Sequence, residues 1–171
     1  VAVGEADALA KAHPQAVTLD LGGTTVVPGL IDAHGHVPGL GLTLSIADLT
    51  GTRGKAEIVE RLKAFEARLD KDAWLLGRGW DQNDWDAKAF PTAADLDAAF
   101  PTRPVWLERV DGHAGWANTA ALKRATRDLA GDWQPEGGQV LRAGGKASGV
   151  FVDNAMGLIQ AAVPEATAEQ A

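Results

Sequence analysis

The sequence predicts an α/β protein. Short apolar runs of the kind that form buried strands alternate along the chain with segments whose apolar residues recur at helical spacing. The composition is that of a folded domain, with 46% hydrophobic and 23% charged residues. The chain has 171 residues, fewer than the roughly 250 that a complete (β/α)8 barrel typically needs. We therefore expect α/β elements that make up at most a part of such a barrel.

The first 27 residues are expected to form a small β unit. Segments rich in Val, Leu and Thr have the composition of strands, and they are separated by a short helical turn and a Gly-Gly turn. The strands are expected at residues 1–3, 17–19 and 24–27, the helical turn around residues 5–11, and the hairpin turn at Gly22-Gly23. Pro28-Gly29 ends this unit. The short apolar run Leu30-Ile31-Asp32-Ala33 follows, and it is typical of a buried parallel strand.

Helices and strands alternate in the rest of the chain. The clearest helix spans residues 55–70, where Ile58, Leu62, Phe65 and Leu69 recur at steps of four, three and four and so share one face. Thr92 and Asp95 have the spacing of a capping box, which opens a short helix that ends at Pro101. The other expected elements, in chain order, are a strand at 74–77, a strand at 105–107, a helix at 117–124, a Gly-rich loop or irregular hairpins at 128–148, and a helix at 151–162.

Composition and charge exclude several classes of function. The sequence contains no Cys, which excludes disulfides, thiolate zinc sites and Cys nucleophiles. A net charge of −7 and a pI near 5.0 argue against unaided binding of nucleic acid or an anionic membrane. The sequence has no apolar run near the roughly 20 residues of a membrane span. Residue 1 is Val and residues 164–171 look like the start of a helix, so we expect a piece of a longer polypeptide, whose localisation is left open.

The strongest chemical signal is His34-Gly35-His36. On a strand, residues two apart project from the same face about 6.6 Å apart, so two imidazoles can converge on one ion. Zinc suits such nitrogen ligands, and iron, manganese or nickel can also be held. The alternative is a pair of loop histidines at a strand end with no ion.

Residues 27–36, Val-Pro-Gly-Leu-Ile-Asp-Ala-His-Gly-His, resemble the signature of the amidohydrolase superfamily. In that signature a Pro-Gly turn leads into the first barrel strand, and an Asp-x-His-x-His run ends it. Three later segments are similar to the YtcJ-like branch, amidohydrolase family 3, which includes N-substituted formamide deformylases. They are Gly77-Arg78-Gly79-Trp80-Asp81 with Trp85, residues 105–122 with Arg109-Val110-Asp111-Gly112-His113 and Asn118, and residues 149–156.

This resemblance implies the N-terminal part of a metal-dependent (β/α)8 barrel hydrolase. Residues 1–27 would then be part of a small β-sandwich, 28–50 the first barrel strand with its metal motif, 51–147 an α/β insertion, and 148–171 the return to the barrel. His34 and His36 would bind one or two divalent ions, most simply Zn²⁺, and metal-activated water would hydrolyse an amide-like C–N bond. The further histidines and the general-base aspartate of the family have no counterpart in this sequence. The implied partners are an amide-like substrate and the rest of the polypeptide, and a homo-oligomer is left open.

His113 and Asp153 are two further candidates, each with an alternative. His113 follows a strand and the turn dipeptide Asp111-Gly112, so it either contacts the substrate near the metal or hydrogen-bonds its own turn. Asp153 lies where the family pattern tends to place an acidic residue. It is either a metal ligand or its close partner, or a cap of the helix expected there.

An aromatic and acidic cluster follows the strand at 74–77. Trp80, Asp81 and Trp85 either line a substrate pocket, with apolar indole walls and a carboxylate to orient polar groups, or anchor the loop to the core while the carboxylate faces water. For the whole chain, the hypothesis of an incomplete metal-dependent amidohydrolase competes with that of a non-catalytic α/β module whose histidines bind metal incidentally or not at all.

Overall fold

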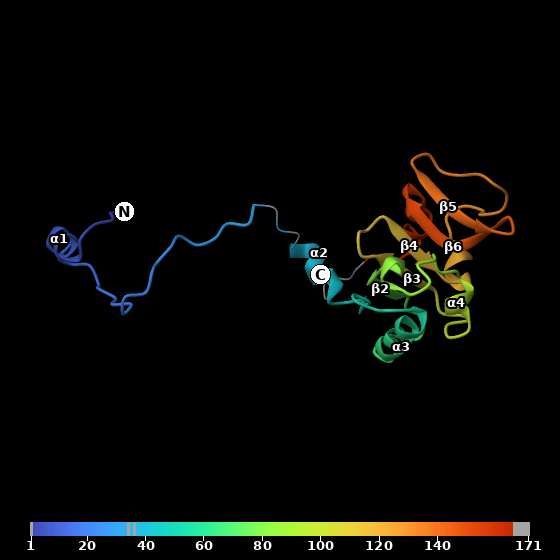
Figure 1. Cartoon of the computed structure of the whole chain (residues 1–171), viewed down its shortest axis with the longest axis horizontal. Coiled ribbons are helices and arrows are strands. Elements are labelled where there is room, and N and C mark those ends of the chain that lie inside the picture. The colour runs from blue at the N-terminus through green and yellow to red at the C-terminus, as the bar shows by residue number, and fades with distance from the viewer. Residues whose placement is uncertain (1, 34, 36, 166–171) are drawn as a thin grey trace. The chain divides into compact units, whose positions relative to one another are not determined.

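The computed structural model describes residues 2–33, 35 and 37–165. It divides into two compact units, residues 1–35 and 36–171, which we describe separately (Figure 1). His34 and His36, the predicted metal ligands, lie outside the described residues.

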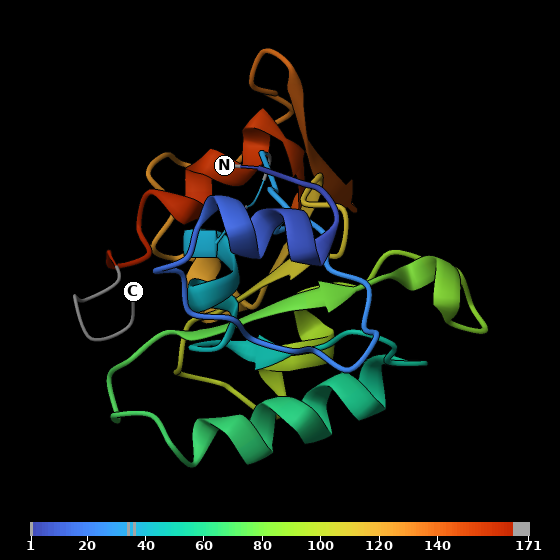
Figure 2. The same cartoon turned by 90° about the vertical axis from the view of Figure 1, so that its left-hand side faces the viewer.

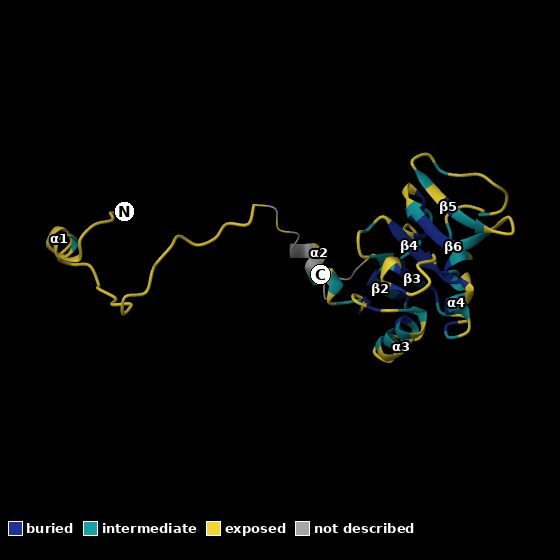
Figure 3. Ribbon diagram, viewed as in Figure 1, coloured by how far each residue is buried: buried dark blue, intermediate teal, exposed yellow. Residues whose placement is uncertain are grey.

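The first unit contains one helix, α1 (Ala6–Ala12), at the position expected for a helical turn. Gly22 and Gly23 both have positive φ and form the predicted turn. Residues 2–33 contain no strand and are almost all exposed (Figure 3). Leu30 and Ile31 are 100% and 91% exposed. A strand exists only through hydrogen bonds to a neighbour, and these residues find no such neighbour in their own unit. The assignment of residues 1–27 to a β-sandwich and of 28–33 to a barrel strand therefore stays a prediction.

The second unit is built on a mixed six-stranded sheet with the order β1-β2-β3-β4-β6-β5. Its strands are β1 (Ala47–Asp48), β2 (Leu75–Trp80), β3 (Val105–Arg109), β4 (Ala114–Ala117), β5 (Gly138–Ala143) and β6 (Lys146–Asp153). β1, β2 and β3 are parallel, whereas β4 pairs antiparallel with β3 and β6, and β5 pairs antiparallel with β6. The α/β class predicted from the sequence is confirmed.

Short helices cover both faces of this sheet (Figures 1 and 2). The helices of this unit are α2 (Val37–Thr43), α3 (Lys55–Glu66), α4 (Ala94–Asp97), α5 (Thr119–Leu122) and α6 (Gly157–Gln160), with 3-10 turns η1 (Gln82–Asp84) and η2 (Asn154–Met156). Of these, α3 and α4 pack against one face of the sheet, and α5 and α6 pack against the other. Among the described residues, no helix has the length and apolar content needed to cross a membrane.

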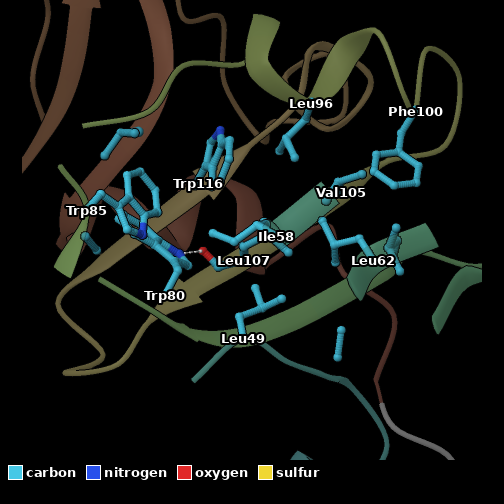
Figure 4. Packing of buried hydrophobic residues seen from close by; sticks show 14 residues of the cluster. Leu49, Ile58, Leu62, Trp80, Trp85, Leu96, Phe100, Val105, Leu107 and Trp116 are labelled. Carbon is cyan, nitrogen blue, oxygen red and sulfur yellow. Dashed lines mark hydrogen bonds between the residues drawn. The ribbon is translucent and has the colours of Figure 1, made fainter. Parts of the chain in front are cut away.

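The second unit has two hydrophobic clusters, one on each face of the sheet, and successive side chains of β3 alternate between them. Val105 and Leu107 face one cluster, which Ile58 and Leu62 of α3 complete, while Trp106 faces the other. The first cluster also contains three indoles, those of Trp80, Trp85 and Trp116, with ring centroids 5.9 to 6.3 Å apart (Figure 4). The periodic residues of the predicted 55–70 helix thus bury their apolar face as expected, although α3 ends at Glu66.

Asn118 fastens the start of α5 to the rest of the unit. Its side chain is fully buried. Its Oδ1 accepts hydrogen bonds from the backbone N–H of Val105 and Ala121 at 2.9 and 3.0 Å. Its Nδ2 donates to the carbonyl oxygens of Phe100 and Arg103 at 2.8 and 2.9 Å. One amide side chain therefore serves β3, the α5 N-terminus and the loop that follows α4.

Two predicted elements are corrected. Residues 114–117 form strand β4 where the sequence predicted a helix from 117, and the helix that follows, α5, begins only at Thr119. Residues 151–153 belong to β6 and not to a helix, which begins with the 3-10 turn at Asn154. The boundary expected between 147 and 148 falls inside β6, and the assignment of 51–147 to an insertion and of 148–171 to the barrel stays a prediction. Pairing with neighbouring strands outweighs local pattern at both places.

The side chain of Gln134 forms hydrogen bonds with the backbone of the outer strand β5. Gln134 accepts a hydrogen bond from the backbone N–H of Val140 at 2.6 Å and donates one to the Val140 carbonyl at 3.0 Å. On its other side, Val140 is opposite Phe151 of β6.

Candidate functional site

The topology gathers several predicted site residues at one end of the sheet. The carboxyl ends of the parallel strands β1, β2 and β3 lie at this end, together with the amino end of β4 and the carboxyl end of β6. Asp81 follows β2, Asp111 and His113 lie between β3 and β4, and Asp153 ends β6. Ligands of open α/β sheets commonly bind outside the carboxyl ends of parallel strands. We take this end as the candidate site.

His113 and Asp153 are bonded to each other. They sit side by side at the end of the β4–β6 ladder, where the Asp153 backbone N–H donates to the His113 carbonyl at 3.1 Å. The His113 Nδ1 lies 2.8 Å from Asp153 Oδ1. The side chains are 70% and 48% exposed, so the pair faces solvent within this unit. The structure thus joins two residues that the sequence analysis proposed independently.

Arg109 and Asp111 support this pair from the β3 side. The Arg109 guanidinium donates two hydrogen bonds to the Asp111 carboxylate, at 2.9 and 2.6 Å. Asp111 Oδ1 also accepts the backbone N–H of His113 at 3.0 Å. Hydrogen bonds from Arg109 hold the pKa of Asp111 below its usual value, and the bond from His113 acts in the same direction, although burial opposes both.

The backbone at Asp153 has an unusual conformation. Its φ of 48° and ψ of −126° are values that glycine adopts readily and side-chain-bearing residues rarely do. Asp153 precedes η2, yet its side chain makes no capping hydrogen bond. The capping interpretation is therefore not supported, since the carboxylate turns to His113.

The tryptophans of the predicted cluster are core residues. Trp80 is 0% and Trp85 3% exposed, and the Trp80 Nε1 donates to the Leu107 carbonyl at 2.9 Å (Figure 4). Of the two interpretations left open by the sequence, burial favours the anchoring of the loop over a pocket wall. Asp81 accepts a hydrogen bond from the Asn83 backbone N–H at 2.9 Å and opens η1.

A cavity of 570 Å³ lies in the second unit and was not predicted from the sequence. Its apolar walls include Leu76 of β2, Trp106 of β3 and Phe65 of helix α3. Its polar lining includes Glu108, which accepts a hydrogen bond from Gln160 Nε2 at 2.8 Å and pairs with Arg78 at 3.4 Å. Arg78 also donates to the Val110 carbonyl at 3.3 Å. Arg78 thereby connects this cavity to the loop that carries His113.

Sequence reasoning missed the roles of Arg109 and Asp111. The available signal was their spacing, because in Arg109-Val110-Asp111-Gly112-His113 the polar residues are two apart and so can share one side of an extended segment. No group of three or more His, Asp or Glu residues that is suited to a metal ion occurs among residues 2–33, 35 and 37–165. The metal-ligand role of Asp153 therefore stays a prediction.

Comparison with known proteins identifies the family to which the chain belongs. The chain resembles part of the crystal structure of an uncharacterized metal-dependent hydrolase from Pyrococcus horikoshii OT3. The TM-score is 0.55 and the identity 25%, over 81% of this chain and 25% of the other. Residues 17–171 match the model of the Amidohydrolase family. The chain belongs to this amidohydrolase family.

Two curated relatives resemble the chain along most of its length. The putative amidohydrolase YtcJ of Bacillus subtilis is 36% identical over 154 residues, which make up 88% of this chain and 28% of YtcJ. The N-substituted formamide deformylase of Arthrobacter pascens is 32% identical over 166 residues, or 92% of this chain and 30% of the deformylase. The chain thus spans less than a third of either relative.

Proposed function

We propose that the protein to which this sequence belongs is a metal-dependent amidohydrolase that cleaves an amide-like C–N bond. The observation that carries this proposal is the family match over residues 17–171, which includes the His34-Gly35-His36 motif. The names of the deformylase and of the Pyrococcus hydrolase support the reaction class and the dependence on metal.

His34 and His36 are the residues that would hold the metal. Two imidazoles separated by a glycine suit a borderline ion such as Zn²⁺, and the glycine adds no side chain between them. A bound divalent ion supplies polarisation of the substrate carbonyl and activation of water. The remaining ligands and the general base belong, in this proposal, to the rest of the polypeptide.

The exposed run before the motif is consistent with a barrel strand. Leu30 and Ile31 are large apolar residues with almost no contacts in their own unit. Full exposure of two such side chains is unfavourable in water by roughly 1.5–3 kcal/mol each. Neighbouring strands of a (β/α)8 barrel would cover them, and we propose that the rest of the polypeptide provides these strands.

The second unit is proposed to contribute to substrate binding. The Asp153–His113 pair and Asp81 lie at the carboxyl ends of parallel strands, where polar side chains orient ligands. Trp80 and Trp85 would act indirectly, because they fix the loop that carries Asp81.

The test is metal content and activity of the intact protein. Replacing both His34 and His36 with Ala is expected to remove the bound metal and the hydrolysis of a panel of amides and formamides together. His13→Ala is the matched control, because His13 is an exposed residue outside the motif, and it should keep both properties. Full metal occupancy in the double variant would refute the ligand assignment. An intact protein that binds metal but hydrolyses no member of the panel would favour the non-catalytic alternative.

A further inference from the structure

We propose that Asp153 is a positioning residue that holds His113 in a single tautomer, so that the His113 Nε2 accepts a hydrogen bond from the N–H of an amide substrate. This inference rests on the proposed function. It narrows the substrate class to primary and N-monosubstituted amides, because only these carry an N–H next to the carbonyl.

The backbone and ring of His113 are held at three points. Asp111 accepts the backbone N–H at 3.0 Å, the backbone N–H of Asp153 donates to the carbonyl at 3.1 Å, and Asp153 Oδ1 lies 2.8 Å from Nδ1. Arg109 fixes Asp111 in turn through two hydrogen bonds. The ring is therefore oriented before any ligand arrives, as is required of a side chain that orients a substrate.

The partner of Nδ1 determines the chemistry at Nε2. An ionised carboxylate only accepts hydrogen bonds, so the nitrogen that contacts it must be the one that carries the proton. In the neutral imidazole the second nitrogen then bears a lone pair. No described residue bonds Nε2, and the side chain is 70% exposed. His113 therefore presents an acceptor, and not a donor, to a neutral ligand.

The unfavourable backbone conformation indicates that the Asp153 side chain is needed. Glycine would fit a φ of 48° without strain, and the carboxylate caps no helix. The one side-chain hydrogen bond in the described structure that a glycine would lose is the bond to His113. Lys88 offers a control for the effect of a glycine on the backbone. It is the other non-glycine residue with positive φ in the described part of the chain, at 47°.

The first experiment measures the tautomer directly and does not depend on activity. Long-range ¹H–¹⁵N spectra of the 171-residue chain at about pH 8, where an ordinary imidazole is neutral, should show His113 protonated at Nδ1. In Asp153→Gly the ring should shift toward protonation at Nε2, while Lys88→Gly should leave it unchanged. A wild-type ring protonated at Nε2, or one that does not respond to Asp153→Gly, would overturn the proposal.

The second experiment uses the intact protein and matched pairs of amides that share an acyl group and differ in carrying one or two N-substituents. Asp153→Gly should lower kcat/KM about 10- to 100-fold for the N-monosubstituted member. It should change kcat/KM for the N,N-disubstituted member little, and Lys88→Gly should change neither. Asp153→Asn should recover part of the preference, because its amide oxygen can still accept from Nδ1.

A double-mutant comparison separates positioning from a general effect on folding. In a His113→Ala background, Asp153→Gly should cause no further loss of kcat/KM, because the residue that it positions is absent. Additive losses would overturn the proposal. An active enzyme with an unchanged preference between the paired amides would also overturn it and leave the proposed function intact. Absence of all hydrolysis would count against the proposed function, while the tautomer measurement would still decide the role of Asp153.

Discussion

Asn118→Ala removes four hydrogen bonds at once from the interior of the second unit. The amide serves two backbone N–H groups and two carbonyl groups, at 2.8 to 3.0 Å, and its side chain is fully buried. Each bond contributes about 1 kcal/mol net, and water cannot replace the amide at a site without exposure. We therefore expect a loss of about 4 kcal/mol, a large share of the roughly 5–15 kcal/mol by which domains are stable.

Urea unfolding followed by tryptophan fluorescence measures this loss. All six tryptophans lie between residues 74 and 133, so the signal reports on the second unit alone. With a slope of about 2 kcal/mol/M, the midpoint should fall by about 2 M with the slope unchanged.

The matched control is Asn154→Ala. Asn154 is exposed and its amide donates one hydrogen bond, to the Glu136 carbonyl at 3.0 Å. Loss of such a surface contact should change the stability by no more than about 0.5 kcal/mol. If Asn118→Ala lowered the urea midpoint no more than Asn154→Ala, the four hydrogen bonds of the Asn118 amide would not stabilise the unit as argued.

Two further predictions concern β4 and the loop before it. A Cβ at Gly115 would lie 1.9 Å from the Trp106 ring, so Gly115→Ala should destabilise the unit by about 1–3 kcal/mol. Gly157→Ala is the control, because a Cβ there meets open space and the φ of −56° is helical, and it should not destabilise the unit. Equal urea midpoints for the two variants would contradict this prediction. Arg109 lowers the pKa of folded Asp111, so the stabilisation is present above the unfolded value of about 3.9 and is lost as the pH falls through the lower folded value. The urea midpoint of Asp111→Asn should therefore lie further below that of the unchanged protein at pH 7 than at pH 3. A difference in midpoint that increased as the pH fell would contradict this prediction.

Elements with a strong local signal could be predicted from the sequence. The spacing of Ile58 and Leu62 places both on one helical face, and both are buried against the sheet. Strand β4 could not be predicted in the same way. Ala114-Gly115-Trp116-Ala117 contains no β-branched residue, and its strand conformation depends on the neighbours β3 and β6. Pairing between segments far apart in the chain has no local signature.

The same limit applies to the candidate site. His113 and Asp153 were each candidates on their own, but their contact spans forty positions and depends on the register of β4 with β6. For Trp80 and Trp85, residue type alone could not distinguish a pocket wall from a core anchor, and only burial could.

Gln134 has a consequence for how the second unit behaves in solution. A strand at the edge of a sheet offers unpaired N–H and C=O groups on which another chain can extend the sheet, the common route to aggregation. At Val140 both groups are taken by one side-chain amide, which imitates the peptide unit of an additional strand. At the opposite edge, β1 is only two residues long. The glutamine at Val140 and the short strand β1 at the opposite edge both reduce the backbone that a second molecule can pair with.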